Sequence, residues 1–256
     1  MKGRIKKILI NAAYPAGVAA AVLLVWYLAS LAVGVTLILP TPGEAFGEFS
    51  AYLKSAEFYV NLGSTVLRSL YGFLLSFIIA AVLSLLALNG IVKKIVSCLM
   101  AVVRAVPTMS VILILVMVFS PDTAPVTVAL IVICPTLYSQ FSASIESIDP
   151  KLIQMSRIYK VGLKDRIFKL YLPNMADGIL EGCANGISLN IKLVIAAEAL
   201  ALPVKSIGKM MWYSKAMLEA EKLFALTIAA VILSVAAESI IRLIKRLLLR
   251  WKYDRV

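Results

Sequence analysis

The chain has 256 residues, of which 61% are hydrophobic and 16% are charged, whereas ordinary soluble domains contain about 25% charged residues. Several of its apolar runs are about 20 residues long, the length needed to cross the hydrocarbon core of a bilayer, and this excludes a soluble globular protein. The net charge of +12 is carried mainly by the short segments between those runs, which favours lipid headgroups over nucleic acid as the partner of the basic residues.

The apolar runs predict an all-α, polytopic membrane protein with six transmembrane helices. In chain order, these predicted spans are roughly 14–35, 62–89, 95–119, 125–145, 176–201 and 223–243. Backbone that contacts lipid must satisfy its own hydrogen bonds, so helices are expected, and the sequence lacks the ten-residue alternation of a β-barrel. The first run is too long for the apolar part of a signal peptide, so we expect an uncleaved span. A single domain is expected over residues 1–256.

Lysine and arginine residues predict the orientation of the chain. Of the 26 such residues, 18 lie in the ends and loops that share a side with the N-terminus, and five lie on the opposite side. Because loops rich in these residues stay in the cytoplasm, both termini and the central loop are expected there. On the opposite side, prolines in residues 36–61 end the first span, and a short amphipathic helix is expected after them.

Two arginines lie within predicted spans. Arg68 is near the start of the second span, and we expect its side chain to extend to the membrane surface. Arg104 is near Pro107 in the third span, where the missing backbone N–H of proline favours a kink. Two interpretations of Arg104 stay open: it pairs with carbonyl groups freed by the kink, or it faces a translocation pathway.

The central loop, residues 146–175, is basic and has a helical pattern. Asp149 and Pro150 are typical of a helix start, and apolar residues then recur at spacings of three and four as far as Leu170. Gly162 is expected to divide this segment into two short helices, and Pro173 to mark the return to the membrane. The pattern alone fits an amphipathic helix on anionic lipid and a docking helix for a cytoplasmic partner equally well.

The fifth span combines small, polar and charged residues. Its glycines recur every four residues, a spacing that permits close helix packing; they are Gly178, Gly182 and Gly186. Lys192 and Glu198 follow, and an ionised side chain at mid-bilayer costs about 2.5–3.5 kcal/mol on insertion scales unless water or a partner receives it. We predict that these residues line a pathway with Asn190 and Ser188. Glu198 as a structural partner of another helix is the alternative.

The loop resembles the cytoplasmic loop of ABC importer permeases. In that family Glu-Ala-Ala is followed by three residues, Gly, nine residues and then Ile-x-Leu-Pro. Here the corresponding residues are Gln154, Met155, Ser156, Lys160, Leu172 and Pro173. Every spacing is kept, but Gln-Met-Ser replaces Glu-Ala-Ala, and Lys160 replaces the family glycine, with Gly162 two positions later.

Other stretches are similar to the nitrate, sulfonate and taurine branch of these permeases. They are LPTP at 39–42, STVLR at 64–68 with Gly72 and Phe73, RAVP at 104–107, AAE at 196–198 and SIG at 206–208. The resemblance implies a type I importer permease with six transmembrane helices that works as a pair in a bacterial plasma (inner) membrane. It identifies the family but not the solute.

The resemblance also implies partners. Two ATPase subunits would contact the loop, with Met155 and Tyr159 as anchors, and a binding protein would deliver the solute from outside. The chain contains no phosphate-binding loop, so ATP and Mg²⁺ are expected in the ATPase, and neither a catalytic site nor a cofactor or metal site is expected here. A secondary transporter or channel that needs no ATPase is the alternative, but it would not require the loop spacing.

Overall fold

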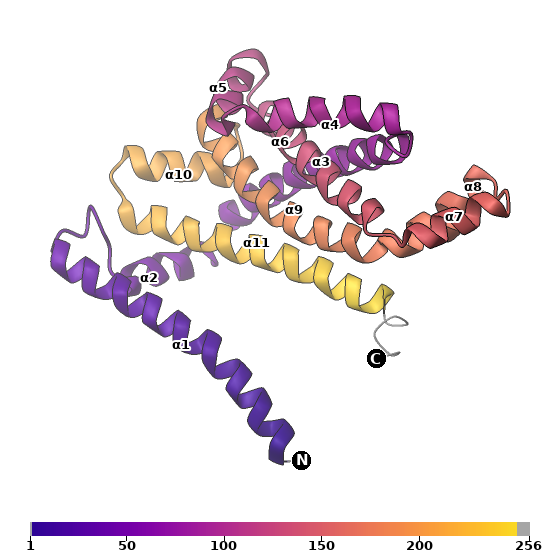
Figure 1. Ribbon diagram of the computed structural model, residues 1–256. Helices are drawn as coiled ribbons and strands as arrows, with labels where there is room; N and C mark the ends of the chain where they lie inside the picture. The colour runs from indigo at the N-terminus through magenta and orange to yellow at the C-terminus, as the bar shows by residue number, and fades with distance from the viewer. Residues whose placement is uncertain (1, 250–256) are drawn as a thin grey trace. The chain divides into compact units, whose positions relative to one another are not determined.

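The computed structural model describes residues 2–249, and every regular element in that range is a helix (Figure 1). The longer helices are α1 (Lys2–Val33), α3 (Ala56–Leu86), α4 (Gly90–Ala105), α6 (Ala124–Glu146), α9 (Leu172–Ala201) and α11 (Ala220–Leu248). The shorter ones are α2 (Pro42–Tyr52), α5 (Thr108–Val118), α7 (Pro150–Ile158), α8 (Leu163–Asp165), the π-helix η1 (Arg166–Tyr171) and α10 (Ile207–Ala216). The predicted all-α class is confirmed.

Each of the six predicted spans falls on helix. Within the described residues, four helices are long and apolar enough to cross a membrane: α3, α6, α11 and the continuous stretch Arg166–Ala201. The third predicted span is divided into α4 and α5, which together pass the same test. The first corresponds to α1, whose apolar part, Gly17–Val33, is shorter.

The described helices form two compact units. Three helices, α3, α10 and α11, have residues in both units. One contains the residues up to Tyr59 with Met210–Ala229, and the other contains Val60–Lys209 with the residues from Ala230 onwards. The single-domain organisation stays a prediction.

In the first unit, side-chain contacts fix the chain after α1. The Trp26 indole N–H donates to the carbonyl of Pro40 at 3.0 Å, and its ring stacks on Phe224 with the ring centres 5.4 Å apart. Thr41 and Glu44 then form a capping box that starts α2. The short helix predicted between the first two spans is therefore present.

In the second unit, α6 and α9 pack closely along their length (Figure 1). A Cβ atom on Gly178 would lie 3.0 Å from Cβ of Ser144, and one on Gly182 would lie 3.2 Å from Cβ of Gln140. Gly186 packs in the same way on Leu137. All three glycines of the predicted packing stripe thus contact α6 of the same chain, because a larger side chain has no room there.

The break between α4 and α5 bends the chain by 88° at Pro107. Val106 has an extended conformation, as expected for a residue before proline. A kink was predicted here, and its size divides the expected single helix into two.

The contacts of α4 and α5 with α6 identify the pair as one broken span. Near the start of α4, Lys93 pairs with Glu146 at 2.8 Å, and Ser97 then bonds Tyr138 at 3.0 Å. Beyond the break, Ile112 of α5 packs in one cluster with Val128. These partners run from the C-terminal end of α6 to its N-terminal part. The pair α4 and α5 therefore extends along the length of α6, whereas a re-entrant loop would return to the end at which it began.

Candidate functional site

The helix α7 presents an apolar surface at its C-terminal end. Asp149 caps its start by accepting a hydrogen bond from the backbone N–H of Lys151 at 2.8 Å. On its inner face, Ser156 is buried and Ile153 packs on a cluster formed by Ile148, Tyr171 and Met175. The outer face carries exposed apolar side chains, with exposed fractions of 49% for Met155, 77% for Ile158 and 76% for Tyr159. Gln154 is also exposed.

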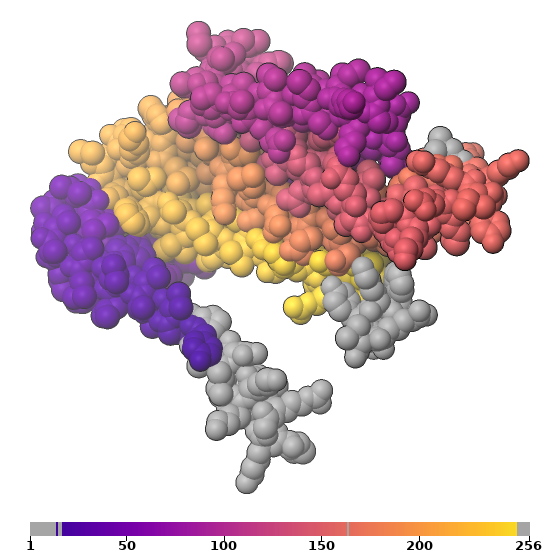
Figure 2. All heavy atoms as spheres, viewed as in Figure 1, coloured from indigo at the N-terminus to yellow at the C-terminus, as the bar shows by residue number. Residues whose placement is uncertain are grey.

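Figure 2 shows the segment of α7 and α8 as a projection from one end of the second unit. Large apolar side chains on such a projection fit a surface that a partner covers. The arrangement is compatible with the predicted docking residues and leaves their role as a prediction.

The predicted break at Gly162 lies two residues earlier. The N–H of Val161 donates to the carbonyl of Ser156, and that of Lys160 donates to Arg157, each at 3.0 Å. These are the two bonds of a Schellman motif, whose central residue has a left-handed conformation. That residue is Lys160, with φ of +50°, whereas Gly162 has no positive φ. Lys160 thus occupies the position where ABC importer permeases have glycine.

The second half of the loop runs without interruption into α9. The π-helix η1 leads directly to Leu172 and Pro173, and the helix is continuous from Arg166 to Ala201. The helix passes Pro173 without a break, because proline is tolerated in the first turn of α9 directly after a π-helical turn. The return of the chain to the membrane at Pro173 stays a prediction. Leu172 and Pro173 are exposed.

One face of the C-terminal half of α9 is uncovered. Most residues from Asn185 to Ala201 are buried, but a stripe at helical spacing is exposed: Asn185, Leu189, Lys192, Ala196 and Leu200. Lys192 is the only charged residue of this stripe, and among the described residues it has no hydrogen-bond or ion-pair partner. A lone cation on such a face needs water, a ligand or another chain to receive it.

Asn190 and Ser188 do not belong to this stripe. The Asn190 amide donates to the carbonyl of Ser69 in α3 at 2.8 Å and is fully buried, and Ser188 is buried too. Both residues were predicted to line the pathway with Lys192, but the helical rotation turns them into the packed interior. The sequence proximity to Lys192 was therefore misleading.

Arg104 and Lys192 lie level with the same part of α6. Lys192 is midway between Gly186, which packs on Leu137, and Ala197, which clusters with Val128. That position is level with the middle of α6, around residues 131–132. Four residues of α6 line a cavity of about 230 Å³ at the α4–α5 break: Ile131, Val132, Pro135 and Thr136. Among the described residues, Arg104 is the only charged one in its lining.

Glu198 occupies a different environment from the one predicted. Its carboxylate is fully buried and accepts hydrogen bonds from the Thr65 hydroxyl at 2.8 Å, from Arg68 at 3.0 Å and from the backbone N–H of Gly208 at 3.3 Å. Glu198 is thus held between helices and does not share the uncovered face with Lys192. The alternative of a structural partner fits this geometry.

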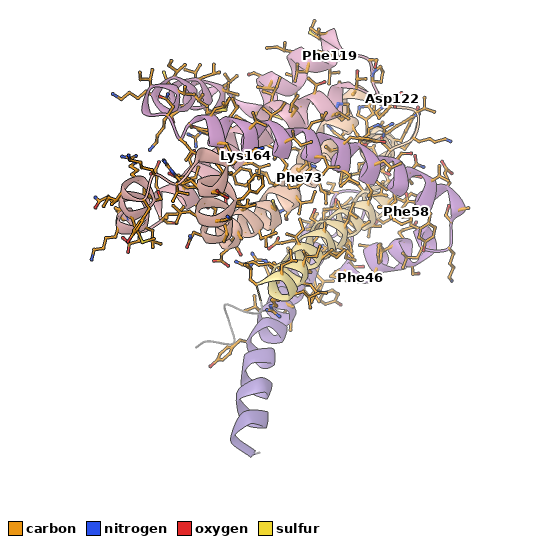
Figure 3. All side chains as sticks on the ribbon, turned by 90° about the vertical axis from the view of Figure 1, so that its right-hand side faces the viewer. Phe46, Phe58, Phe73, Phe119, Asp122 and Lys164 are labelled. Carbon is orange, nitrogen blue, oxygen red and sulfur yellow. The ribbon has the colours of Figure 1, made fainter. Side chains whose placement is uncertain are left out.

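Arg68 of α3, which was expected to extend to the membrane surface, binds several groups, and its position relative to the membrane stays a prediction. Besides Glu198, its guanidinium binds the carbonyl of Lys205 at 2.8 Å and the carboxylate of Asp122. Asp122 lies in the turn after α5, close to Phe119 (Figure 3). The arginine therefore joins α3, α9 and two loops in one polar network.

Gly208 is required by the close approach of α10 to α9. A Cβ atom at this position would lie 2.5 Å from Cβ of Glu198 and 2.6 Å from the backbone nitrogen of Ala199. The first two N–H groups of α10 bind Thr65 and Glu198, and the Ser206 hydroxyl accepts from Lys209. A carboxylate at this helix start is also favoured by the helix dipole.

Sequence reasoning missed a second ionic network, at the other end of α9. Lys245 of α11 pairs with Glu181 at 2.8 Å and with Asp177 at 3.1 Å, and Arg242 pairs with Glu181 at 2.9 Å and with Glu238. The four-residue spacing of Asp177 and Glu181 was the available signal, since it places both carboxylates on one face of a helix.

A cavity in the first unit has both apolar and charged residues in its lining. It has a volume of about 490 Å³ and is lined by residues of α2, α10 and the start of α11, including Glu48, Tyr213 and Lys222. Burial raises the pKa of the Tyr52 phenol in this cavity, although its hydrogen bond to Ser214 and the nearby Lys222 act in the opposite direction. Within the described residues, no cluster of His, Cys, Asp and Glu has the arrangement of a metal site.

Three comparisons relate the chain to known proteins. Residues 72–250 match the family described as binding-protein-dependent transport system inner membrane component. The protein assigned as the aliphatic sulfonates transport permease SsuC of Bacillus subtilis is 25% identical over 239 residues, which are 91% of this chain and 85% of the relative.

Solved structures of two ABC transporters share the fold. A chain of an amino acid ABC transporter solved with histidines is 16% identical, with a TM-score of 0.58, and the match covers 73% of this chain and 89% of that chain. A chain of the methionine ABC transporter MetNI in an inward-facing conformation is 14% identical, with a TM-score of 0.61 and coverage of 73% and 92%.

The family match covers more than half of the chain, and the fold agrees with it. The chain therefore belongs to the family of binding-protein-dependent transport system inner membrane components, the non-catalytic membrane subunits of ABC importers.

Proposed function

We propose that this membrane subunit forms the pathway of an ABC importer for a small organic anion, as one of two copies. The family implies an ATPase and a substrate-binding protein as partners. Two copies of the chain, two ATPase subunits that bind ATP and Mg²⁺, and a binding protein outside the membrane are the assembly we propose.

The uncovered stripe of α9 carries this proposal. It includes Lys192, which has no partner among the described residues, in the half of α9 whose other faces are buried. A second copy facing this stripe would enclose a pathway with a lysine from each side, and two cations at mid-membrane favour an anion. The name of the Bacillus subtilis relative supports a sulfonate as the type of anion.

The proposed contact with the ATPase is the outer face of α7. Met155, Ile158 and Tyr159 form an exposed apolar patch that a groove in the ATPase would cover. Because Ile153 packs on Tyr171 and Met175, movement of α7 would be passed to the start of α9. The distribution of basic residues supports a cytoplasmic location for this loop and for both termini.

Uptake by the reconstituted importer tests the proposal. The tagged chain is purified from its native membranes with any ATPase that accompanies it, placed in liposomes and supplied with its binding protein on the outside. We expect ATP-dependent uptake of radiolabelled ethanesulfonate and no uptake of choline, a cation of similar size. Uptake of choline without ethanesulfonate, or purification without an ATPase, would contradict the proposed function.

A further inference from the structure

The cavity at the α4–α5 break has the composition of a site for an anion with an apolar body. Its only charged lining residue is Arg104, and Thr108 and Thr136 supply hydroxyl groups. Apolar side chains complete the wall, including Val111, Ile131 and Val132. The volume of about 230 Å³ lies below the roughly 300 Å³ at which pockets for drug-sized ligands begin, so the cavity suits a small solute.

The charge of Arg104 is not neutralised by the protein. Among the described residues, its guanidinium has no hydrogen-bond or ion-pair partner. Of the two interpretations of Arg104 that were left open, pairing with carbonyl groups freed at Pro107 is therefore not observed among the described residues. The Thr136 hydroxyl donates to the carbonyl of Val132 at 3.2 Å, which leaves its oxygen able to accept but turns its proton away from the cavity. The guanidinium is thus the principal donor available to a ligand.

The location of the break supports the same conclusion. Irregular backbone at membrane depth persists only where protein encloses it or where it lines a water-filled cavity. The break lies beside residues 131–136, in the middle of α6, and α5 begins there with backbone N–H groups that have no partner within the helix. Those groups add positive potential to the side of the cavity that carries Arg104.

We infer that this cavity is a binding site for the anionic group of the transported solute, with Arg104 as its ligand. The inference rests on the proposed function, since it gives the organic anion a place in the membrane subunit. Lys192 lies level with the same part of α6, on the exposed stripe of α9. A short alkyl chain on the anion would contact Val111, Ile131 and Val132, so alkanesulfonates and similar small amphiphilic anions are the expected class.

Charge-selective thiol labelling tests the site directly. The full chain, with its three native cysteines replaced by alanine, carries Thr136→Cys and is placed in lipid nanodiscs. Two methanethiosulfonate reagents of similar size are compared, one with a sulfonate and one with a trimethylammonium group. Ser147→Cys, at the exposed C-terminal end of α6, is the matched control. Thr108→Cys is the second probe if Thr136→Cys does not fold.

The measured quantity is the labelling rate with the anionic reagent divided by the rate with the cationic reagent. We expect this ratio to be about 10-fold higher at Thr136→Cys than at Ser147→Cys, because a nearby cation concentrates anions. Arg104→Gln should remove this preference, Arg104→Lys should retain it, and ethanesulfonate should slow the labelling. If the preference for the anionic reagent at Thr136→Cys is the same with Arg104 as with Arg104→Gln, the proposed site is wrong. The labelling requires neither ATP nor partners, so failure of the site and failure of ethanesulfonate uptake by the wild type are separate results.

Discussion

Arg68 of α3 donates a hydrogen bond of 3.0 Å to the buried carboxylate of Glu198 in α9, 130 positions later in the chain. Glu198 has no exposed side-chain surface, and Arg68 retains 14%. The carboxylate is stable at this depth because Thr65 and the start of α10 supply further donors. This pair joins α3, α9 and the start of α10, and neither residue lies on the uncovered face of α9.

Arg68→Met should strongly destabilise the chain. The substitution leaves the carboxylate of Glu198 buried without its cation, and breaking a buried pair in this way costs about 3–5 kcal/mol. Unfolding by denaturant in detergent micelles measures the loss. Lys93→Met is the matched control, because the Lys93–Glu146 pair is exposed and such pairs contribute about 0–1 kcal/mol. Equal stability of the two variants would show that the Arg68–Glu198 pair is not structural.

Gly208→Ala should also destabilise the fold, by about 1–3 kcal/mol, because the added methyl group overlaps the backbone of α9. Gly63→Ala is the control: an added Cβ there meets no atom within 4 Å, and alanine is favoured over glycine in a helix by about 0.5–1 kcal/mol. The free energy of unfolding should therefore fall in Gly208→Ala and rise in Gly63→Ala. A neutral Gly208→Ala would argue against close contact between α10 and α9.

The sequence predicted these helices better than it predicted their partners. Apolar runs of membrane length determine where helices form, so the predicted spans fall on them, and Pro107 indicated the kink in the third. Periodicity gives no information on which polar groups meet across 130 positions. Thr65, Arg68, Glu198 and Gly208 all lay in stretches similar to permeases, yet only the fold brings them into one network.

The candidate site was predicted unevenly for the same reason. Lys192 was identified from the cost of a charge in an apolar span, which does not depend on the partner. Asn190 and Ser188 were added because they are near it in the sequence, but helical rotation places them in the packed interior. The break at Lys160 was missed because a glycine two residues later is the stronger signal for a helix end.

Lys160→Gly should stabilise the end of α7. A left-handed conformation costs a residue with a side chain about 1–2 kcal/mol, and glycine adopts it without that cost. Hydrogen exchange of the amides in residues 150–161 measures the local opening free energy, which should rise by about 1 kcal/mol. Gly162→Ala, at a position without positive φ, should not lower it. A faster exchange in Lys160→Gly would contradict the observed turn.

Met155→Asp and Tyr159→Asp should each abolish copurification of the ATPase while leaving the chain folded in the membrane. Both side chains are exposed and apolar, and an aspartate would have to lose its water in the proposed contact. Met217→Asp is the matched control, since Met217 is 67% exposed but follows α10, outside the central loop. An ATPase that copurifies equally with all three variants would exclude α7 as the docking surface.

The most direct measurement is ATP-dependent uptake of ethanesulfonate by Lys192→Met in proteoliposomes, with ATP hydrolysis followed in parallel. Methionine keeps the length and apolar stem of lysine and removes only the charge. We expect uptake to fall at least about 10-fold, because a cation at mid-membrane contributes more than 1.4 kcal/mol to the anion's passage, while ATPase copurification is unchanged. Lys94→Met, at an exposed position near the start of α4, should transport like the wild type. Wild-type uptake by Lys192→Met would contradict a pathway for anions along the uncovered face of α9.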